Sequence, residues 1–386
     1  MSHPAGIPTR PVDFSARPML VFWEITRSCL LACKHCRASA TPGALPGQLD
    51  HAEGMHLIDQ VAAFGKPYPI LVLTGGDCLL RDDVFELVAH ATELGVPVCL
   101  SPSVTPMLTP EAIQRMATSG VKAVSLSLDG ACAETHDGVR GIPGHFEKSL
   151  PAIKAIKDAG IKLQINTTVM SGNVHEMPDI AKIVKDYGVD MWEIFFLVHV
   201  GRGEATGAIS PEEHEDVCHF LYDASHHGYV VRTVEAPFFR RVVHERRNGG
   251  GVPETELYAE LSGRLTELCG EGRPRASAHT AATRDGKGIV FVAHDGQVYP
   301  AGFLPLELGS VRDTPLAEIY RDHPTLKAIR AAEFSGKCGV CEFADLCGGS
   351  RARAYASSGD PLGEDTACPY VPSVVDTTES LVAAGV

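Results

Sequence analysis

The sequence predicts an α/β protein whose main unit is an incomplete (β/α)6 barrel, and three observations lead to this fold class. Short apolar runs alternate with amphipathic stretches from Met19 onward. The amphipathic stretches have the 3.6-residue period of helices, and three of them end in glycine, a usual helix stop. The apolar runs carry a two-residue alternation of their own. Strands that alternate with helices indicate βαβ units and a parallel sheet.

Six runs are predicted to be strands because each is short, apolar and bounded by turn residues. They occupy residues 19–26, 69–76, 96–103, 122–130, 161–169 and 190–200. Helices are expected between the first four of them, at 52–65, 81–95 and 110–120. Six such units fall short of the eight strands of a closed (β/α)8 barrel, so the barrel is predicted to be incomplete.

Polar residues alternate with apolar ones in the fourth and fifth strands, where a filled barrel would carry only Val, Ile and Leu. In the fifth strand, Leu163 and Ile165 alternate with Gln164 and Asn166. Because side chains of a strand point alternately to its two faces, the polar set is predicted to face the barrel lumen. A polar lumen indicates a ligand cavity, and the alternative interpretation is a half-solvated sheet.

The flanking segments divide the chain into four predicted parts. Residues 1–18 are interpreted as an N-terminal arm, 19–207 as the partial barrel, 208–285 as a linking region and 286–386 as a C-terminal domain. A helix is expected near Pro211, and residues 288–300 are predicted to form a hairpin with Asp295-Gly296 as its turn.

Composition excludes several classes of function. The chain of 386 residues has a formal net charge of −14 and no strongly basic block, which makes a nucleic-acid partner a poor fit. Neither a signal peptide nor a membrane span is found, so we expect a cytoplasmic protein without membrane contact. Cytosolic thiols stay reduced, and clustered cysteines among the 12 present therefore indicate metal binding or catalysis.

Three cysteines, Cys29, Cys33 and Cys36, follow the first strand with the spacing C-x3-C-x2-C. Iron–sulfur clusters are usually held by four thiolates, so three leave one iron open for another ligand. This pattern resembles the signature of the radical SAM superfamily. The resemblance implies a [4Fe–4S] cluster that binds S-adenosyl-L-methionine (SAM) and cleaves it reductively to a 5′-deoxyadenosyl radical. A zinc knuckle or incidental thiols are the alternatives.

Companion motifs sit at the ends of the later strands. "TGGDCL" closes the second strand, and Gly75, Gly76 and Asp77 resemble the family's motif that meets the methionine amine of SAM. A plain strand-to-helix turn is the alternative. "SLSLDG" and "HDGVRG" resemble the region that binds the ribose and carboxylate of SAM. Further SAM contacts implied by the resemblance are His35, Ser103, Ser127, Asp129, Arg140 and Asn166.

A second group of cysteines lies near the C-terminus and resembles the SPASM/twitch extension of radical SAM enzymes. Its members are Cys338, Cys341, Cys347 and Cys368. Four thiolates indicate a closed site for one auxiliary [4Fe–4S] cluster, with zinc as the alternative. Only one auxiliary cluster is expected, because Arg351 and Ala301 stand where the family has cysteines. The resemblance covers roughly residues 19–370 and is strongest to tetrapyrrole side-chain-modifying enzymes and to the pyrroloquinoline-quinone peptide maturase.

The reaction itself stays open among three predictions. The first is epimerisation or dehydrogenation of a secondary metabolite, such as a carbohydrate-bearing small molecule, with Cys269 as hydrogen donor or Glu24 and Glu193 as acid–base groups. Desolvation in the lumen would raise the pKa of such carboxylates toward the general-base range. The alternatives are maturation of a ribosomal peptide and oxidative decarboxylation of tetrapyrrole side chains. An electron donor such as flavodoxin or ferredoxin is the expected partner, and the sequence does not reveal the oligomeric state. An electron carrier without catalysis is the non-enzyme alternative.

Overall fold

A single curved sheet of ten strands organises the computed structural model, which describes residues 13–205, 207–279 and 281–373. The strand order is β10-β9-β8-β1-β2-β3-β4-β5-β6-β7. The strands are β1 (Leu20–Thr26), β2 (Ile70–Gly75), β3 (Val98–Leu100), β4 (Ala123–Ser127), β5 (Lys162–Val169), β6 (Met191–Phe196), β7 (Val230–Val234), β8 (Ile289–Val292), β9 (Gln297–Tyr299) and β10 (Gly309–Ser310). All six predicted strands are present, and they pair in parallel in sequence order.

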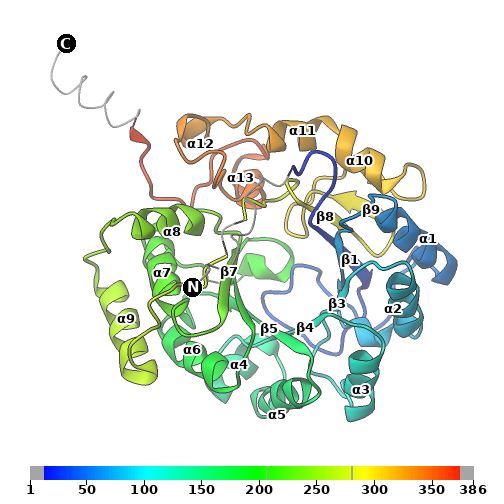
Figure 1. Ribbon diagram of the computed structural model, residues 1–386, viewed down its shortest axis with the longest axis horizontal. Helices are drawn as coiled ribbons and strands as arrows, with labels where there is room; N and C mark the ends of the chain where they lie inside the picture. The colour runs from blue at the N-terminus through cyan, green and yellow to red at the C-terminus, as the bar shows by residue number, and fades with distance from the viewer. Residues whose placement is uncertain (1–12, 206, 280, 374–386) are drawn as a thin grey trace, which may run out of the picture.

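Helices cover the outer face of the sheet (Figure 1). The barrel helices are α1 (His51–Ala62), α2 (Val84–Glu93), α3 (Pro110–Thr118), α4 (Ala133–Arg140), α5 (His145–Asp158), α6 (Met177–Asp186), α7 (Pro211–Ala224), α8 (Phe239–Arg247) and α9 (Glu256–Cys269). The short 3-10 helices are η1 (Cys78–Leu80), η2 (Val174–Glu176) and η3 (Gly201–Ala205). The C-terminal helices are α10 (Leu316–Asp322), α11 (Pro324–Arg330), α12 (Gly336–Val340) and α13 (Arg351–Ser358), grouped on one side of the barrel.

The two-residue alternation has the predicted consequence for burial. In β5, Leu163 and Ile165 are buried beneath the helices, whereas Gln164 and Asn166 are only partly buried. The apolar face of the sheet and the inward faces of the helices form the hydrophobic core. The opposite face of β5 is therefore polar and lines the inside of the curved sheet.

The sheet continues beyond the six predicted strands and is not closed. The predicted hairpin forms as β8 and β9, but β8 also pairs in parallel with β1, with Leu20 opposite Ile289. The sheet thus crosses the predicted boundary at residue 286. Before β8, Ala278 forms an isolated parallel bridge to Val231 of β7, so this segment covers the outer edge of β7.

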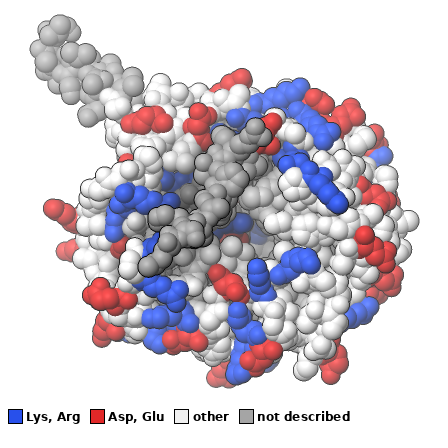
Figure 2. All heavy atoms as spheres, in the orientation of Figure 1, with Lys and Arg blue, Asp and Glu red and all other residues white. Residues whose placement is uncertain are grey.

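Two smaller expectations concern the ends and the surface of the chain. Residues 1–12 of the predicted arm lie outside the described residues, but Phe14 is buried and its carbonyl accepts a hydrogen bond from Tyr320. In the part of the chain that the structure describes, no helix has the length and apolarity that a membrane span requires. Figure 2 shows acidic and basic side chains interspersed around the rim of one face.

Candidate functional site

The first cysteine group lies on the loop that leaves the C-terminal end of β1. The loop folds back on itself, since Cys29 N–H donates to the Thr41 carbonyl at 2.8 Å. From η3, Arg202 Nε donates to the Cys33 carbonyl at 2.9 Å. Two sulfurs receive N–H donors: Cys29 Sγ from Leu31 at 3.4 Å and Cys33 Sγ from Arg140 at 3.5 Å. Such donors stabilise thiolates, so these residues fit an iron–sulfur cluster.

Gly75 and Gly76 allow the end of β2 to approach this loop closely. Gly76 N–H donates to the Thr26 carbonyl at 2.8 Å, and Asp77 N–H donates to the Ser28 carbonyl at 2.7 Å. A Cβ at Gly75 would lie 2.3 Å from the Thr26 oxygen, and one at Gly76 would lie 2.2 Å from the Ser28 oxygen. Only glycine permits this approach of two backbones.

Asp77 and Ser103 connect the same turn to the end of β3. The Asp77 carboxylate accepts hydrogen bonds from Ser103 N–H at 3.2 Å and from the Thr105 hydroxyl at 2.7 Å. Burial raises the pKa of Asp77 despite these bonds. The Ser103 hydroxyl donates to the Gly76 carbonyl at 3.3 Å and lies 4.0 Å from Cys29 Sγ. Four predicted site residues therefore meet at one place.

Asp129 and Arg140 form a buried ion pair at the end of β4, and His35 Nε2 lies 3.7 Å from the same carboxylate. Burial raises the pKa of Asp129, but Arg140 and His35 outweigh it, and the net shift is downward. Burial lowers the pKa of His35 to about 4, so its ring is neutral at pH 7. Its Nδ1 is buried without a hydrogen-bond partner among the described residues. Ser127 lies opposite Asn166 across the β4–β5 pair.

The two predicted lumen carboxylates are both ion-paired. Glu24 lies 3.0 Å from Arg37 and 3.6 Å from His294, and Glu193 pairs with Arg232. Burial raises the pKa of Glu24, but Arg37 and His294 lower it more, so the net shift is downward. The upward shift expected for Glu24 is therefore wrong, because cations accompany the carboxylate into the lumen.

Cys269 does not face the lumen. It ends α9, an outer helix that packs against α6 and α7 (Figure 1). Its carbonyl accepts a hydrogen bond from Lys185, near the end of α6, and its thiol is close enough to Tyr229 to affect that residue electrostatically. Tyr229 precedes β7, so Cys269 lies at the end of the sheet opposite the cysteine loop. This location does not suit a hydrogen donor to a substrate held beside that loop.

The tail cysteines come from α12, from the loop that follows it and from the segment after α13, and they are close enough to affect one another electrostatically. Cys338 Sγ accepts from Asp365 N–H at 3.5 Å and from Arg351 at 3.6 Å, and Cys347 Sγ accepts from Gly349 N–H at 3.4 Å. Burial and the nearby Cys347 together raise the pKa of Cys368 to about 12. Among the described residues, no three His, Cys, Asp or Glu side chains have the spacing of a single-ion site. A cluster spaces its thiolates more widely, since each binds a different iron.

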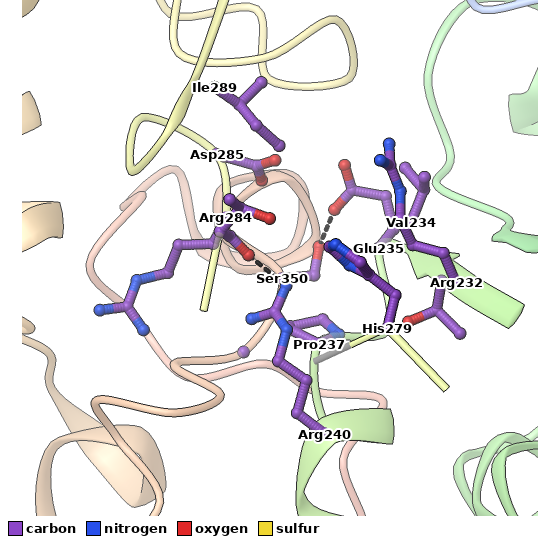
Figure 3. Close-up of a pocket in the computed structure, with 13 residues that line it drawn as sticks. Arg232, Val234, Glu235, Pro237, Arg240, His279, Arg284, Asp285, Ile289 and Ser350 are labelled. Carbon is purple, nitrogen blue, oxygen red and sulfur yellow. Dashed lines mark hydrogen bonds between the residues drawn. The ribbon is translucent and has the colours of Figure 1, made fainter. Parts of the chain in front are cut away.

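Sequence reasoning missed a pocket between β7 and the segment that leads into β8 (Figure 3). Its cavity volume is about 50 Å³ and it opens to solvent, so it has room for a small polar group such as a carboxylate and not for a whole organic ligand. Six of its thirteen lining residues are charged or titratable: Arg232, Glu235, Arg240, His279, Arg284 and Asp285. They come from the predicted linking region, where β7 is too short and too polar to stand out by its periodicity.

The pocket adjoins the tail cysteines. Arg284 Nη1 donates to the carbonyls of Ala344 at 2.8 Å and Cys347 at 3.2 Å. Arg240 donates to the carbonyl of Leu346 at 3.2 Å. Through Arg232 and its partner Glu193, the opposite wall of the pocket connects to the lumen face of β6. The pocket thus lies between the barrel interior and the tail loop.

Comparison with known proteins identifies the relatives of this arrangement. The model of the radical SAM superfamily matches residues 23–188. The chain is 41% identical to the AdoMet-dependent heme synthase of Nitratidesulfovibrio vulgaris, over 96% of this chain and 98% of that protein. It is 37% identical to the AdoMet-dependent heme synthase of Methanosarcina barkeri, over 92% of this chain and 97% of that protein.

A solved structure shares the fold. SuiB of Streptococcus suis, bound to its precursor peptide SuiA, superposes with a TM-score of 0.65, over 92% of this chain and 76% of that chain, at 14% identity. At this identity the likeness concerns the fold alone, and it confirms the predicted α/β architecture with an unclosed, barrel-like parallel sheet. The comparisons do not support the predicted sugar or secondary-metabolite substrate, or epimerisation.

Proposed function

The chain belongs to the radical SAM superfamily and to its SPASM-type members, and we propose that it decarboxylates carboxylate-bearing side chains of a tetrapyrrole oxidatively. The superfamily uses a [4Fe–4S] cluster and SAM. We assign the cluster that binds SAM to Cys29, Cys33 and Cys36. We assign one auxiliary cluster to the tail cysteines, Cys338, Cys341, Cys347 and Cys368.

The cationic pocket is the observation that carries this proposal. The chain has a net charge of −14, yet Arg232, Arg240 and Arg284 line one pocket. Among the described residues, neither Arg240 nor Arg284 has a carboxylate within ion-pair distance. Both donate to backbone carbonyls instead, and the Arg284 guanidinium points away from the pocket toward the tail loop (Figure 3). Burial and neighbouring cations lower the pKa of each to about 10. A bound carboxylate would relieve this repulsion, and arginine suits carboxylates because of its forked donors.

The relatives favour a tetrapyrrole as the bearer of those carboxylates. Two of them, at 41% and 37% identity over nearly the whole chain, are heme synthases by name. Decarboxylation of a propionate to a vinyl group removes one hydrogen atom, one CO2 and one electron from the side chain. The cluster and SAM supply the acceptor of that hydrogen atom when they are bound. The residues of this chain hold the carboxylate, orient its neighbouring carbon and keep water away.

An external reductant is part of the proposal, since the family needs one to start each cycle. We propose flavodoxin or ferredoxin as the electron donor. The released electron must also leave the substrate for a one-electron acceptor, so the reaction is oxidative overall. This requirement separates decarboxylation from a redox-neutral epimerisation.

The test uses the full chain, reconstituted with iron and sulfide and supplied with SAM and dithionite. Iron coproporphyrin, a porphyrin with methyl and propionate side chains, is the substrate probe. We expect 5′-deoxyadenosine together with a porphyrin that has lost CO2 and two hydrogen atoms, detected by mass spectrometry. Arg232→Gln should reduce turnover, whereas Arg264→Gln on the exposed face of α9 should not. Deoxyadenosine without any change in the porphyrin would contradict the proposal.

A further inference from the structure

Glu235 has an unusual backbone conformation at the pocket wall. It directly follows β7, and its φ of +59° lies in the left-handed region that non-glycine residues rarely adopt. The surrounding structure holds it there, because Arg353 donates to its carbonyl at 2.9 Å and the Ser350 hydroxyl donates to its Oε2. Strained conformations of this kind concentrate at functional sites. A glycine would be usual in this conformation, but here the residue is a glutamate, and its carboxyl lines the pocket (Figure 3).

The charges around Glu235 leave it without a cation of its own. It is 6% exposed, and the charged groups that face it are Asp285, Arg353 and Asp365. The Arg353 guanidinium already pairs with Asp365 at 2.9 Å. Glu235 and Asp285 therefore compete to be ionised in one buried place, and two such neighbours favour sharing a single proton.

The hydrogen bonds indicate which of the two holds the proton. Asp285 accepts the Ala352 backbone N–H at 3.0 Å, at the N-terminus of α13, where a negative charge is stabilised. Glu235 receives only the Ser350 hydroxyl, and its Oε1 has no hydrogen-bond partner among the described residues. Asp285 is thus the better site for the charge. Burial and the nearby Asp285 raise the pKa of Glu235 to about 8.

We propose that Glu235 is protonated in the resting pocket and donates a hydrogen bond from Oε1 to a carboxylate of the substrate. This inference rests on the proposed function, because it concerns the same carboxylate that the pocket arginines attract. The arginines supply charge, which acts over a distance, whereas the Glu235 hydroxyl group supplies one donor in a fixed position. An ionised Glu235 would instead repel the substrate carboxylate.

The proposal sets the sign of a pH dependence. Below about pH 8, Glu235 is neutral and donates; above it, the group ionises and the substrate should bind more weakly. Lys287 needs separate treatment, because burial and the charges of Arg284 and Arg240 lower its pKa to about 8 as well. Loss of its positive charge would weaken anion binding over the same range. His279 does not interfere, since burial lowers its pKa to about 4.

The experiment measures binding without turnover. Iron coproporphyrin is titrated anaerobically into the cluster-loaded protein without SAM, and its absorbance change gives the Kd at about pH 7 and about pH 9. All proteins carry Lys287→Arg, which keeps a positive charge at both values. With Glu235 intact, we expect the Kd to rise by up to about tenfold between the two, which is the limit for one group with a pKa of about 8 over this interval. Glu235→Gln, which keeps an N–H donor but cannot ionise, should bind equally well at both.

Three outcomes would overturn the inference. If Glu235→Gln shows the same loss of affinity at high pH, another group titrates. If the protein with Glu235 binds equally at both pH values, the carboxyl does not contact the substrate. If the tetramethyl ester of the porphyrin binds as tightly as the acid, or neither binds, the proposed function fails and the inference with it. If the porphyrin acid is converted in the decarboxylation assay but either of the first two binding results is obtained, the proposed function stands and only the inference about Glu235 is overturned.

A second variant guards against a folding defect in Glu235→Gln. Asp285→Asn removes the neighbouring negative charge, so the pKa of Glu235 should fall. The loss of affinity should then move to lower pH, by a shift that the same titrations measure. An unchanged midpoint in Asp285→Asn would contradict the coupling between the two carboxyls on which the inference depends.

Discussion

Replacing Gly76 with alanine should destabilise the contact between β2 and the cysteine loop. The new Cβ would lie 2.2 Å from the Ser28 carbonyl oxygen and 2.6 Å from its carbon. Both atoms belong to backbone, which cannot turn aside as a side chain can. Overpacking of this kind costs about 1–3 kcal/mol. Separation of the segments would also weaken the bonds from Gly76 N–H and Asp77 N–H, each worth about 1 kcal/mol.

The expected total for Gly76→Ala is therefore about 3–5 kcal/mol, a large share of the stability of an ordinary domain. Urea unfolding of the protein without clusters measures this, and iron content after reconstitution reports whether the loop still binds its cluster. Gly138→Ala is the matched control, because Gly138 lies in α4 with nothing within 4 Å of the new Cβ. It should stabilise by up to about 1 kcal/mol. A Gly76→Ala protein within about 1 kcal/mol of the parent, with normal iron, would refute this reasoning.

Three further predictions test charges and ligands. Arg140→Leu leaves the buried Asp129 carboxylate without its cation and should lower the free energy of unfolding in urea by about 3–5 kcal/mol. Adding Asp129→Asn removes the unpaired charge and should restore part of that free energy; a double variant no more stable than Arg140→Leu would contradict this explanation. Hydrogen bonds from Arg312 and from the Asp50 backbone N–H lower the pKa of Glu53 from 4.5 to about 2, so the stabilisation by the ionised Glu53 is present above pH 4.5 and lost as the pH falls toward 2. Because both side chains are more than one-third exposed, Glu53→Gln should cost under about 1 kcal/mol at neutral pH, and less in high salt. Cys338→Ala should lower the iron content from about eight to about four per chain; an unchanged content would argue against the assigned auxiliary site.

The strands, the cysteine loop and the residues that surround that loop could be predicted from the sequence because their signals are local. Most of the motif residues lie at or shortly after the C-terminal end of a strand, and the C-terminal ends of parallel strands lie at one edge of a sheet. Gly76 and Ser103 therefore meet near Cys29, as the strand order requires. The same reasoning could not predict the lowered pKa of Glu24. The cations that lower it are Arg37 of the cysteine loop and His294, which lies between β8 and β9, far along the chain.

The pocket depends on contacts between distant segments, which no local pattern records. Arg232 belongs to β7, Arg240 to α8 and Arg284 to the loop before β8. They come together because the segment before β8 runs along β7, where Ala278 bridges Val231, and because Arg240 donates to the Thr283 carbonyl. The net charge of −14 sums over the whole chain and so says nothing of this local excess of cations. Glu235 is a similar case, since its left-handed backbone is held by Ser350, the N-cap of α13, and by Arg353 within that helix.

Position 351 shows how a departure from the family pattern can have a structural role of its own. The missing cysteine predicts the loss of a ligand, but the sequence does not show what the replacement contacts. Arg351 is fully buried, lies over the Phe334 ring at 4.3 Å and donates to the Gly363 carbonyl at 2.6 Å. It also donates to Cys338 Sγ at 3.6 Å. Arg351 therefore places a hydrogen-bond donor to Cys338 where the family pattern has a cysteine, and this supports the proposal of one closed auxiliary site and not a partly ligated second one.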